Sequence, residues 1–174
     1  MIVHLIGPGG AGKSTTAPIL AETLNLEWID LDREYLKDSQ IDQDVEERGY
    51  AYYVRKNIDL YLRLTDSIDD VVLATSSGFM TYAHHLHPAI SEIQRSILRS
   101  NSTVLLLPSF DQKICVQETI NRLITRPYES KSVDVQRARI EKRFSIYRPM
   151  SNIQVTTDKA PEDVATEIQR ALGF

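Results

Sequence analysis

Short apolar runs alternate along the chain with longer segments in which apolar residues recur every three or four positions. Runs of four or five residues are typical of buried strands, whereas the longer spacing is typical of amphipathic helices. A polar, mostly helical stretch is expected from about residue 32 to residue 64, with breaks near residues 40–44 and at Gly49. The pattern predicts further helices at residues 13–24, 89–99, 111–124, 134–147 and 161–172. It predicts five strands, at residues 2–6, 27–30, 71–74, 103–107 and 153–155.

Strands that alternate with helices in this way form parallel sheets with helices on both faces. We therefore expect an α/β fold of three layers (αβα), with a five-stranded parallel sheet in the middle. The 174 residues fit one domain of ordinary size, and no internal repeat, low-complexity tract or linker divides them. The prediction is a single domain over residues 1–174.

A glycine-rich segment follows the first predicted strand and opens the first predicted helix. Residues 7–14, with the sequence GPGGAGKS, match the P-loop pattern G-x-x-x-x-G-K-[S/T] at every fixed position. Glycine lets the backbone wrap closely around phosphate, and the helix that follows adds the positive end of its dipole. Lys13 can reach the β- and γ-phosphates of ATP, and the Ser14 hydroxyl can bind Mg²⁺. The nucleotide-binding residues predicted here are Gly9, Gly10, Ala11, Gly12, Lys13, Ser14 and Thr15.

Two aspartates, Asp30 and Asp32, stand where the second predicted strand ends. In open α/β sheets, ligands bind at the carboxyl ends of the strands. A carboxylate there could hold Mg²⁺ through water or accept a proton from a substrate hydroxyl. The alternative is that the pair only marks the start of a helix, because Asp is a favoured N-cap residue.

Composition and charge narrow the classes of function. Apolar residues make up 42% and charged residues 25% of the chain, as in globular proteins, and the net charge is −4. No nucleic-acid partner is expected, because backbone binding needs clustered Lys and Arg. No apolar stretch approaches the roughly 20 residues that span a bilayer. We expect no signal peptide, because residues 1–6 lead directly into the glycine-rich loop and show no basic segment before an apolar run. Cys115 is the single cysteine, so no intramolecular disulfide can form, and we expect a cytoplasmic protein.

Three segments resemble the shikimate kinases, a branch of the P-loop proteins that are similar to nucleoside monophosphate kinases. The resemblance runs almost end to end. It predicts a P-loop fold with a helical substrate-binding subdomain at about residues 32–64 and a short lid at about residues 124–133. The segments are LIGPGGAGKSTTAPILAETLNLEWIDLD (residues 5–32), RLITRPY (122–128) and EKRFSIYRPMSNIQVTTDKAPEDVATEI (141–168).

The resemblance also implies roles for individual residues. Asp30 would assist the metal through water, and Asp32 would bind the substrate hydroxyls and act as the base. Arg126 would close over the transferring phosphate, and Arg143 would grip the substrate carboxylate. The catalytic set implied in this way is Lys13, Asp32 and Arg126. The stretch of residues 157–161, with Lys159 and Pro161, would border the adenine.

Two departures from the family pattern lie on the acceptor side. A glycine triplet normally follows the third strand, where backbone N–H groups meet the substrate, and here the sequence is Ser76-Ser77-Gly78. The resemblance still implies substrate contacts for Ser77 and Gly78. The family's G-E-x-x-F-R segment is only loosely matched, and Arg55, expected to be the second carboxylate-binding arginine, stands one residue further from Gly49 than the pattern requires.

The function implied is therefore that of a shikimate kinase, which transfers a phosphoryl group from MgATP to the 3-hydroxyl of shikimate. One alternative, favoured by the two serines, is a kinase of the same fold acting on another hydroxy acid, a sugar acid or a nucleotide. A second alternative is a nucleotide-binding protein without catalysis. The charged residues named above argue against the second alternative. A protein that only binds a nucleotide does not need a complete set of groups to neutralise charge during phosphoryl transfer. The expected partner is a small hydroxy acid, and we expect a monomer.

Three further features have simpler interpretations. His84, His85 and His87 do not share one helix face, so we expect surface histidines and no metal site. Cys115 is interpreted as a small buried hydrophobe. Arg139, on the same predicted helix as Arg143, is a reserve candidate for binding phosphate.

Overall fold

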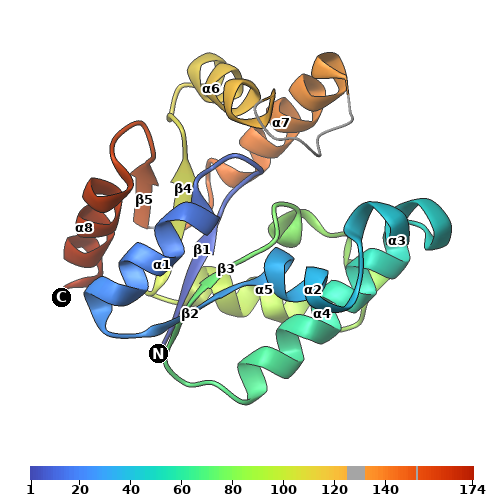
Figure 1. The fold of residues 1–174 in the computed structure, drawn as a ribbon, viewed down its shortest axis with the longest axis horizontal. Helices are drawn as coiled ribbons and strands as arrows, with labels where there is room; N and C mark the ends of the chain where they lie inside the picture. The colour runs from blue at the N-terminus through green and yellow to red at the C-terminus, as the bar shows by residue number, and fades with distance from the viewer. Residues whose placement is uncertain (125–131, 152) are drawn as a thin grey trace.

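A five-stranded, all-parallel sheet forms the middle of the molecule. The computed structural model describes residues 1–124, 132–151 and 153–174. Neighbouring strands follow the order β2-β3-β1-β4-β5 (Figure 1), and every pair is parallel. The strands are β1 (Ile2–Ile6), β2 (Glu27–Asp30), β3 (Val71–Ala74), β4 (Thr103–Leu107) and β5 (Ile153–Thr156). The α/β class and the five strands predicted from the sequence are confirmed.

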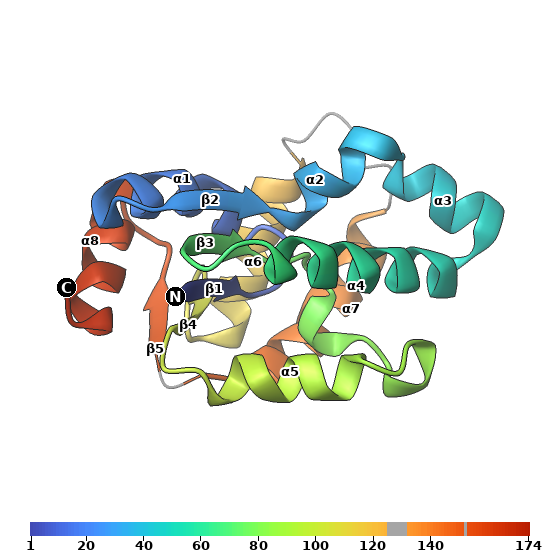
Figure 2. The same ribbon diagram turned by 90° about the horizontal axis from the view of Figure 1, so that it is seen from below.

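Helices cover both faces of the sheet, as the buried runs require. Side chains of β4 alternate between two cores: Val104 and Leu106 pack with α1 (Lys13–Leu24) and α8 (Pro161–Leu172). Leu105 and Leu107 pack with the core on the opposite face, which includes residues of α5 (Ile90–Arg99). Figure 2 shows α1 and α5 on opposite sides of the strands. The three-layer arrangement follows from this period of two in the strands.

Three helices occupy the stretch predicted to be a broken helical segment. They are α2 (Leu31–Asp38), α3 (Ile41–Arg48) and α4 (Tyr50–Asp66). Gly49, with a φ of +86°, separates α3 from α4, as predicted. The earlier break falls at residues 39–40, and the prediction of a break through residues 41–44 was wrong, because they form the first turn of α3. The Tyr35 hydroxyl of α2 donates to Asp44 of α3 at 2.7 Å, and Lys56 of α4 lies 3.5 Å from the same carboxylate, so the three helices are joined.

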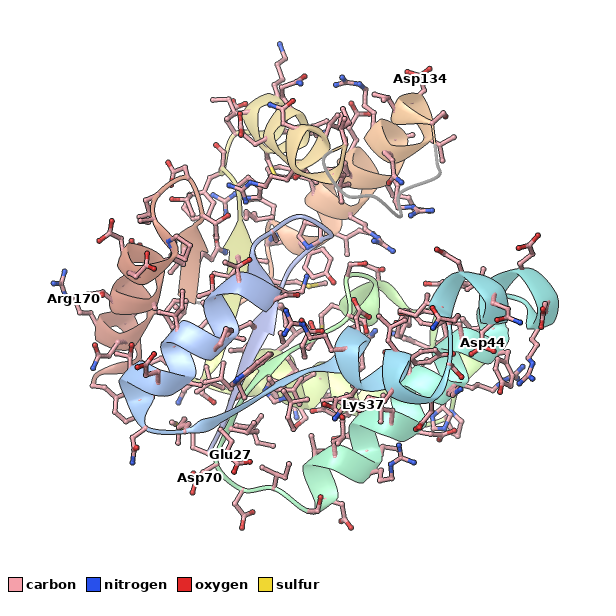
Figure 3. The ribbon with its side chains drawn as sticks, viewed as in Figure 1. Glu27, Lys37, Asp44, Asp70, Asp134 and Arg170 are labelled. Atoms are coloured by element: carbon pink, nitrogen blue, oxygen red, sulfur yellow. The ribbon has the colours of Figure 1, made fainter. Side chains whose placement is uncertain are left out.

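The remaining helices lie around the carboxyl edge and the outer faces. They are η1 (Phe79–Thr81), η2 (His84–Leu86), α6 (Gln112–Ile124) and α7 (Val133–Tyr147). The two short 3₁₀ helices were not predicted, because three-residue turns are too short to show a period. Charged side chains such as Asp134 and Arg170 point outward (Figure 3). None of the helices within the described ranges is long and apolar enough to cross a membrane.

The topology places the motifs together. The glycine-rich loop follows β1, the aspartate pair closes β2, and Thr75 follows β3. Because β1, β2 and β3 are parallel and adjacent through β3, these segments meet at one edge of the sheet. This edge is where open α/β sheets bind ligands.

Candidate active site

The glycine-rich loop forms the floor of a pocket at this edge. Gly7 has a φ of +149°, and a Cβ there would collide with the backbone carbonyl oxygen of Leu106. Gly12 is the N-cap of α1 with a left-handed φ of +91°, and no side chain of the described residues caps the helix. The N–H groups at this end of α1 are therefore directed toward the pocket without a side-chain acceptor, as in sites that bind phosphate.

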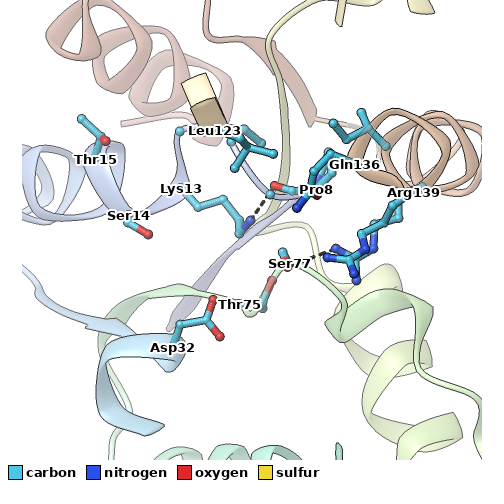
Figure 4. Close-up of a pocket in the computed structure, with 16 residues that line it drawn as sticks. Pro8, Lys13, Ser14, Thr15, Asp32, Thr75, Ser77, Leu123, Gln136 and Arg139 are labelled. Carbon is cyan, nitrogen blue, oxygen red and sulfur yellow. Dashed lines mark hydrogen bonds between the residues drawn. The ribbon is translucent and has the colours of Figure 1, made fainter. Parts of the chain in front are cut away.

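Lys13 lies at the mouth of the loop. Its side chain is buried, and its ammonium group donates to the carbonyl oxygens of Gly7 at 2.7 Å and Pro8 at 3.0 Å. Figure 4 shows the bond to Pro8. The Lys13 ammonium group is thus held against the loop, where the phosphates of a nucleotide would lie.

Asp30 has the helix-capping role that was the alternative interpretation of the aspartate pair. One carboxylate oxygen accepts from the N–H groups of Asp32 at 3.0 Å and Arg33 at 3.1 Å, so Asp30 is the N-cap of α2. The other oxygen, Oδ2, is buried and has no hydrogen-bond partner in the described structure. An oxygen in this state can accept from metal-bound water.

Asp32 lines the pocket from the first turn of α2. Its Oδ1 is also buried without a hydrogen-bond partner among the described residues. Burial raises the pKa of the Asp32 carboxyl, and the charge of Asp30 acts in the same direction. A hydrogen bond with Ser76 and the positive charges of Lys13 and Arg143 oppose this rise in pKa. A carboxylate with a raised pKa is a better proton acceptor.

Ser77 and Gly78 meet Arg143 on the acceptor side. Arg143 donates to the Ser77 hydroxyl at 3.1 Å, and the Tyr147 hydroxyl donates to the Ser77 carbonyl oxygen at 3.1 Å. A Cβ on Gly78 would lie 3.0 Å from a nitrogen of Arg143, so a larger residue would displace that guanidinium group. Three of the residues predicted to contact the substrate therefore lie together in the structure.

Ser76, which also bonds with Asp32, belongs to a buried polar network that the sequence did not reveal. Asn57 donates to the Ser76 hydroxyl at 3.0 Å, and the Tyr82 hydroxyl donates to Asn57 Oδ1 at 3.2 Å. Both Ser76 and Asn57 are fully buried. Ser76, the first of the two serines that replace glycines, thus supports the pocket wall behind Asp32. Ser77, the second, contacts Arg143.

The pocket brings together most of the predicted site and leaves some of it outside. Asp32 and Arg139 lie on opposite sides of it in Figure 4. The P-loop, Asp32, Ser77 and Arg143 line it as predicted. Sequence analysis assigned no role to the lining residues Pro8, Thr75, Leu123, Gln136 and Ile140, because single residues of these types carry no motif. The lining is formed by Pro8, Gly9, Gly10, Ala11, Gly12, Lys13, Ser14, Thr15, Asp32, Thr75, Ser77, Leu123, Gln136, Arg139, Ile140 and Arg143.

Three further predicted residues lie away from the pocket lining. Arg55 is exposed on α4 and does not line the pocket. Lys159 is paired with Glu167, and Pro161 begins α8; neither lines the pocket. Arg126, with residues 125–131 of the predicted lid, lies outside the described residues. The roles predicted for these residues stay predictions.

Arg122 was part of a recognised segment but had no assigned role. Its guanidinium group donates to the Gly10 carbonyl oxygen at 3.0 Å and to the Thr157 hydroxyl at 2.9 Å. It therefore joins the P-loop to the loop after β5, on the side where the adenine contacts are expected. One feature of the sequence could have indicated a role for Arg122. It lies near the end of the helix predicted at residues 111–124, directly before the predicted lid.

The histidines form no metal site in the described part of the chain. His84 and His85 are exposed, and the imidazole of His87 lies 3.2 Å from Asp59. Within the described ranges, no group of three His, Cys, Asp or Glu side chains could hold a metal ion. A metal at the P-loop would therefore need oxygen ligands from the nucleotide or water.

Comparison with known proteins agrees with this geometry. A family model described as "Shikimate kinase" matches residues 9–173. The shikimate kinase of Chromohalobacter salexigens is 33% identical over 173 residues, which cover 97% of this chain and 89% of that protein. That of Tolumonas auensis is 30% identical over 180 residues, covering 99% of this chain and 96% of that protein.

Solved structures give the same result for the fold. The structure of shikimate kinase from Acinetobacter baumannii in complex with shikimate has a TM-score of 0.77 and 25% identity, covering 98% of this chain and 92% of that one. A gluconokinase from Sinorhizobium meliloti has a TM-score of 0.55 and 14% identity, covering 98% and 90%. The similarity to the gluconokinase supports the fold alone.

Proposed function

The chain belongs to the shikimate kinase family, and on this premise we propose that it transfers the γ-phosphoryl group of ATP to the 3-hydroxyl of shikimate. One observation carries the proposal: an unpartnered, buried carboxylate oxygen of Asp32 lies in the same pocket as the P-loop and Arg143. A donor cradle, a proton acceptor and a cation for the acceptor's carboxylate are what this reaction needs.

The residues present fit ATP with Mg²⁺. The Ser14 hydroxyl lines the pocket, and Asp30 Oδ2 is a buried oxygen without a hydrogen-bond partner in the described structure. Oxygen atoms are the ligands that Mg²⁺ prefers, and it usually keeps phosphate and water in its shell. When bound, the ion would neutralise charge on the phosphates.

The protein's own groups would act as follows. The Lys13 ammonium group would exchange the carbonyl oxygens of Gly7 and Pro8 for phosphate oxygens. Asp32 would orient the acceptor hydroxyl and take its proton at a carboxylate oxygen. Arg143, held by Ser77, would bind the acceptor carboxylate with two parallel hydrogen bonds.

Two parts of the proposal concern residues at the edges of the pocket. Arg122 would keep the P-loop and Thr157 in place for adenine, beside the predicted contacts of Lys159 and Pro161. Arg126 and the segment of residues 124–133 are proposed to close over the phosphates and exclude water. Since a single chain supplies every group named, we propose a monomer that needs no nucleic acid.

The test is coupled ADP release from the purified protein with MgATP, with and without shikimate. Release that depends on shikimate supports the proposal. If the protein binds ATP but releases no ADP in response to shikimate, shikimate is not its acceptor. The assignment of the nucleotide site would still hold.

A kinase for another small hydroxy acid is the second candidate. The observation in its favour is that the Ser77 hydroxyl already binds Arg143, at a place where the family has glycine. The same assay with a panel of hydroxy acids and sugar acids separates the two: the better acceptor is the one with the higher kcat/KM.

A further inference from the structure

Helix α7 presents two arginines to the pocket. Arg139 and Arg143 are four residues apart, so they lie on the same helix face one turn from each other. Both line the pocket, together with Gln136 and Ile140 of the same face. Each is only partly exposed, whereas the intervening Lys142 is exposed.

These two guanidinium groups have no counter-ion in the described structure. No carboxylate of the described residues forms an ion pair with Arg139 or Arg143. The bond that Arg143 makes to the Ser77 hydroxyl is to a neutral group. Asp32 is the single carboxylate among the lining residues, and Lys13 adds a further positive charge. The pocket therefore has an excess of positive charge, which favours more than one anionic group in its ligands.

The arginine expected on α4 is not available to the pocket. Arg55 is exposed and outside the lining. Val54, which stands at the spacing from Gly49 that the family pattern requires, is completely buried in the core. Neither residue is part of the wall that Arg143 and Arg139 form.

Tyr50 places Arg139 on the acceptor side of the pocket. Its hydroxyl lies 3.4 Å from the position that a Cβ on Gly78 would take. Burial raises the pKa of Tyr50, and the positive charges of Arg143 and Arg139 oppose that rise. Arg139 lines the same pocket as Ser77 and Arg143. The two arginines thus face the region next to Ser77 and Gly78.

We propose that Arg139 is the second carboxylate-binding arginine of this enzyme, in place of Arg55. The inference rests on the proposed function, since it assigns the acceptor's carboxylate to a cleft between Arg139 and Arg143. Two guanidinium groups on one helix make a planar, multidentate site for a carboxylate. The acceptor class that follows is a hydroxylated carboxylic acid, with a neutral ester or alcohol analogue disfavoured.

The experiment compares Arg139→Ala, Arg139→Lys and Arg55→Ala with the wild-type protein. Initial rates give KM for shikimate and for ATP, and calorimetry gives the Kd of shikimate in the presence of ADP. For Arg139→Ala we expect KM and Kd for shikimate to rise about 10- to 100-fold, since a charged hydrogen-bond donor is lost. KM for ATP should stay within about two-fold, because the proposal assigns Arg139 to the acceptor and not to the nucleotide. Arg139→Lys should give an intermediate value, because charge is kept and the planar fork is lost.

Arg55→Ala and Arg137→Ala serve as matched controls, each removing an arginine that does not line the pocket. Both should bind shikimate as the wild-type protein does, and thermal unfolding checks that all variants are folded. Methyl shikimate adds a second readout: its disadvantage against shikimate should shrink in Arg139→Ala.

Several results would overturn the inference. One is a shikimate Kd unchanged in Arg139→Ala; another is a weakened Kd in Arg55→Ala alone; a third is a raised KM for ATP with normal shikimate binding, which would assign Arg139 to phosphate. Shikimate binding that depends on Arg139 but gives no turnover would support the inference and refute the proposed function. No binding of shikimate to the wild-type protein would overturn both.

Discussion

His4, in the central strand, makes the stability of this fold depend on pH. It is 6% exposed, its Nε2 lies 2.9 Å from the Tyr61 hydroxyl, and its Nδ1 is buried without a partner in the described structure. Burial lowers the pKa of His4 from 6.5 to about 4. The imidazole is therefore neutral in the folded protein throughout the range in which an unfolded histidine becomes charged.

The sign and size follow from the difference between the two states. Below pH 6.5 the unfolded chain binds a proton at His4 that the folded protein does not bind, so stability falls as the pH falls. The contribution is fully present above 6.5 and is lost progressively down to about pH 4. With about 1.4 kcal/mol for each pKa unit, the whole loss is about 3 kcal/mol, of which about 2 kcal/mol falls between pH 7 and pH 5.

Urea denaturation at pH 7 and pH 5 measures this effect. His4→Gln removes the titrating group and keeps a partner for Tyr61, so its free energy of unfolding should change less between the two pH values, by about 2 kcal/mol. His85→Gln, at an exposed histidine, is the matched control and should behave as the wild-type protein. Equal pH dependence in His4→Gln and the wild-type protein would show that His4 is not the group responsible.

Two further predictions concern the walls of the pocket. Arg122→Ala should raise KM for ATP about three- to ten-fold with KM for shikimate unchanged, because the P-loop loses its link to Thr157; initial rates at varied ATP check this, and an effect on shikimate alone would contradict it. Asn57→Ala should lower the free energy of unfolding by about 1–3 kcal/mol in urea, because the buried hydroxyls of Ser76 and Tyr82 each lose one of their hydrogen-bond partners; a loss below about 0.5 kcal/mol would show that these two hydrogen bonds contribute little to stability.

The strands and the P-loop were predictable because local chemistry determines them. An apolar run such as residues 103–107 must be buried whichever strand it pairs with. The loop of residues 7–14 matches the phosphate-binding pattern at every fixed position. The aspartate pair was predictable to the same extent, since its place at the end of a strand assigns it to the ligand-binding edge.

The acceptor side was less predictable, because it depends on the rotation of helices. A shift of one residue turns a side chain by about 100° on a helix, which carries Arg55 to the solvent and Val54 to the core. The apolar spacing of Val54, Ile58 and Tyr61 contains this information, since it defines the buried face of α4. The bond between Asn57 and Ser76 joins residues of two elements, and no local pattern reports it.

The most direct test of the proposed chemistry is the steady-state rate of shikimate-dependent ADP release in Asp32→Asn, measured beside the binding of ATP and shikimate. Asparagine keeps the size of the side chain and cannot take the proton. We expect kcat to fall at least about 100-fold while ATP still binds, because a general base is lost. A kcat within a few-fold of the wild-type value would contradict the role given to Asp32 in phosphoryl transfer.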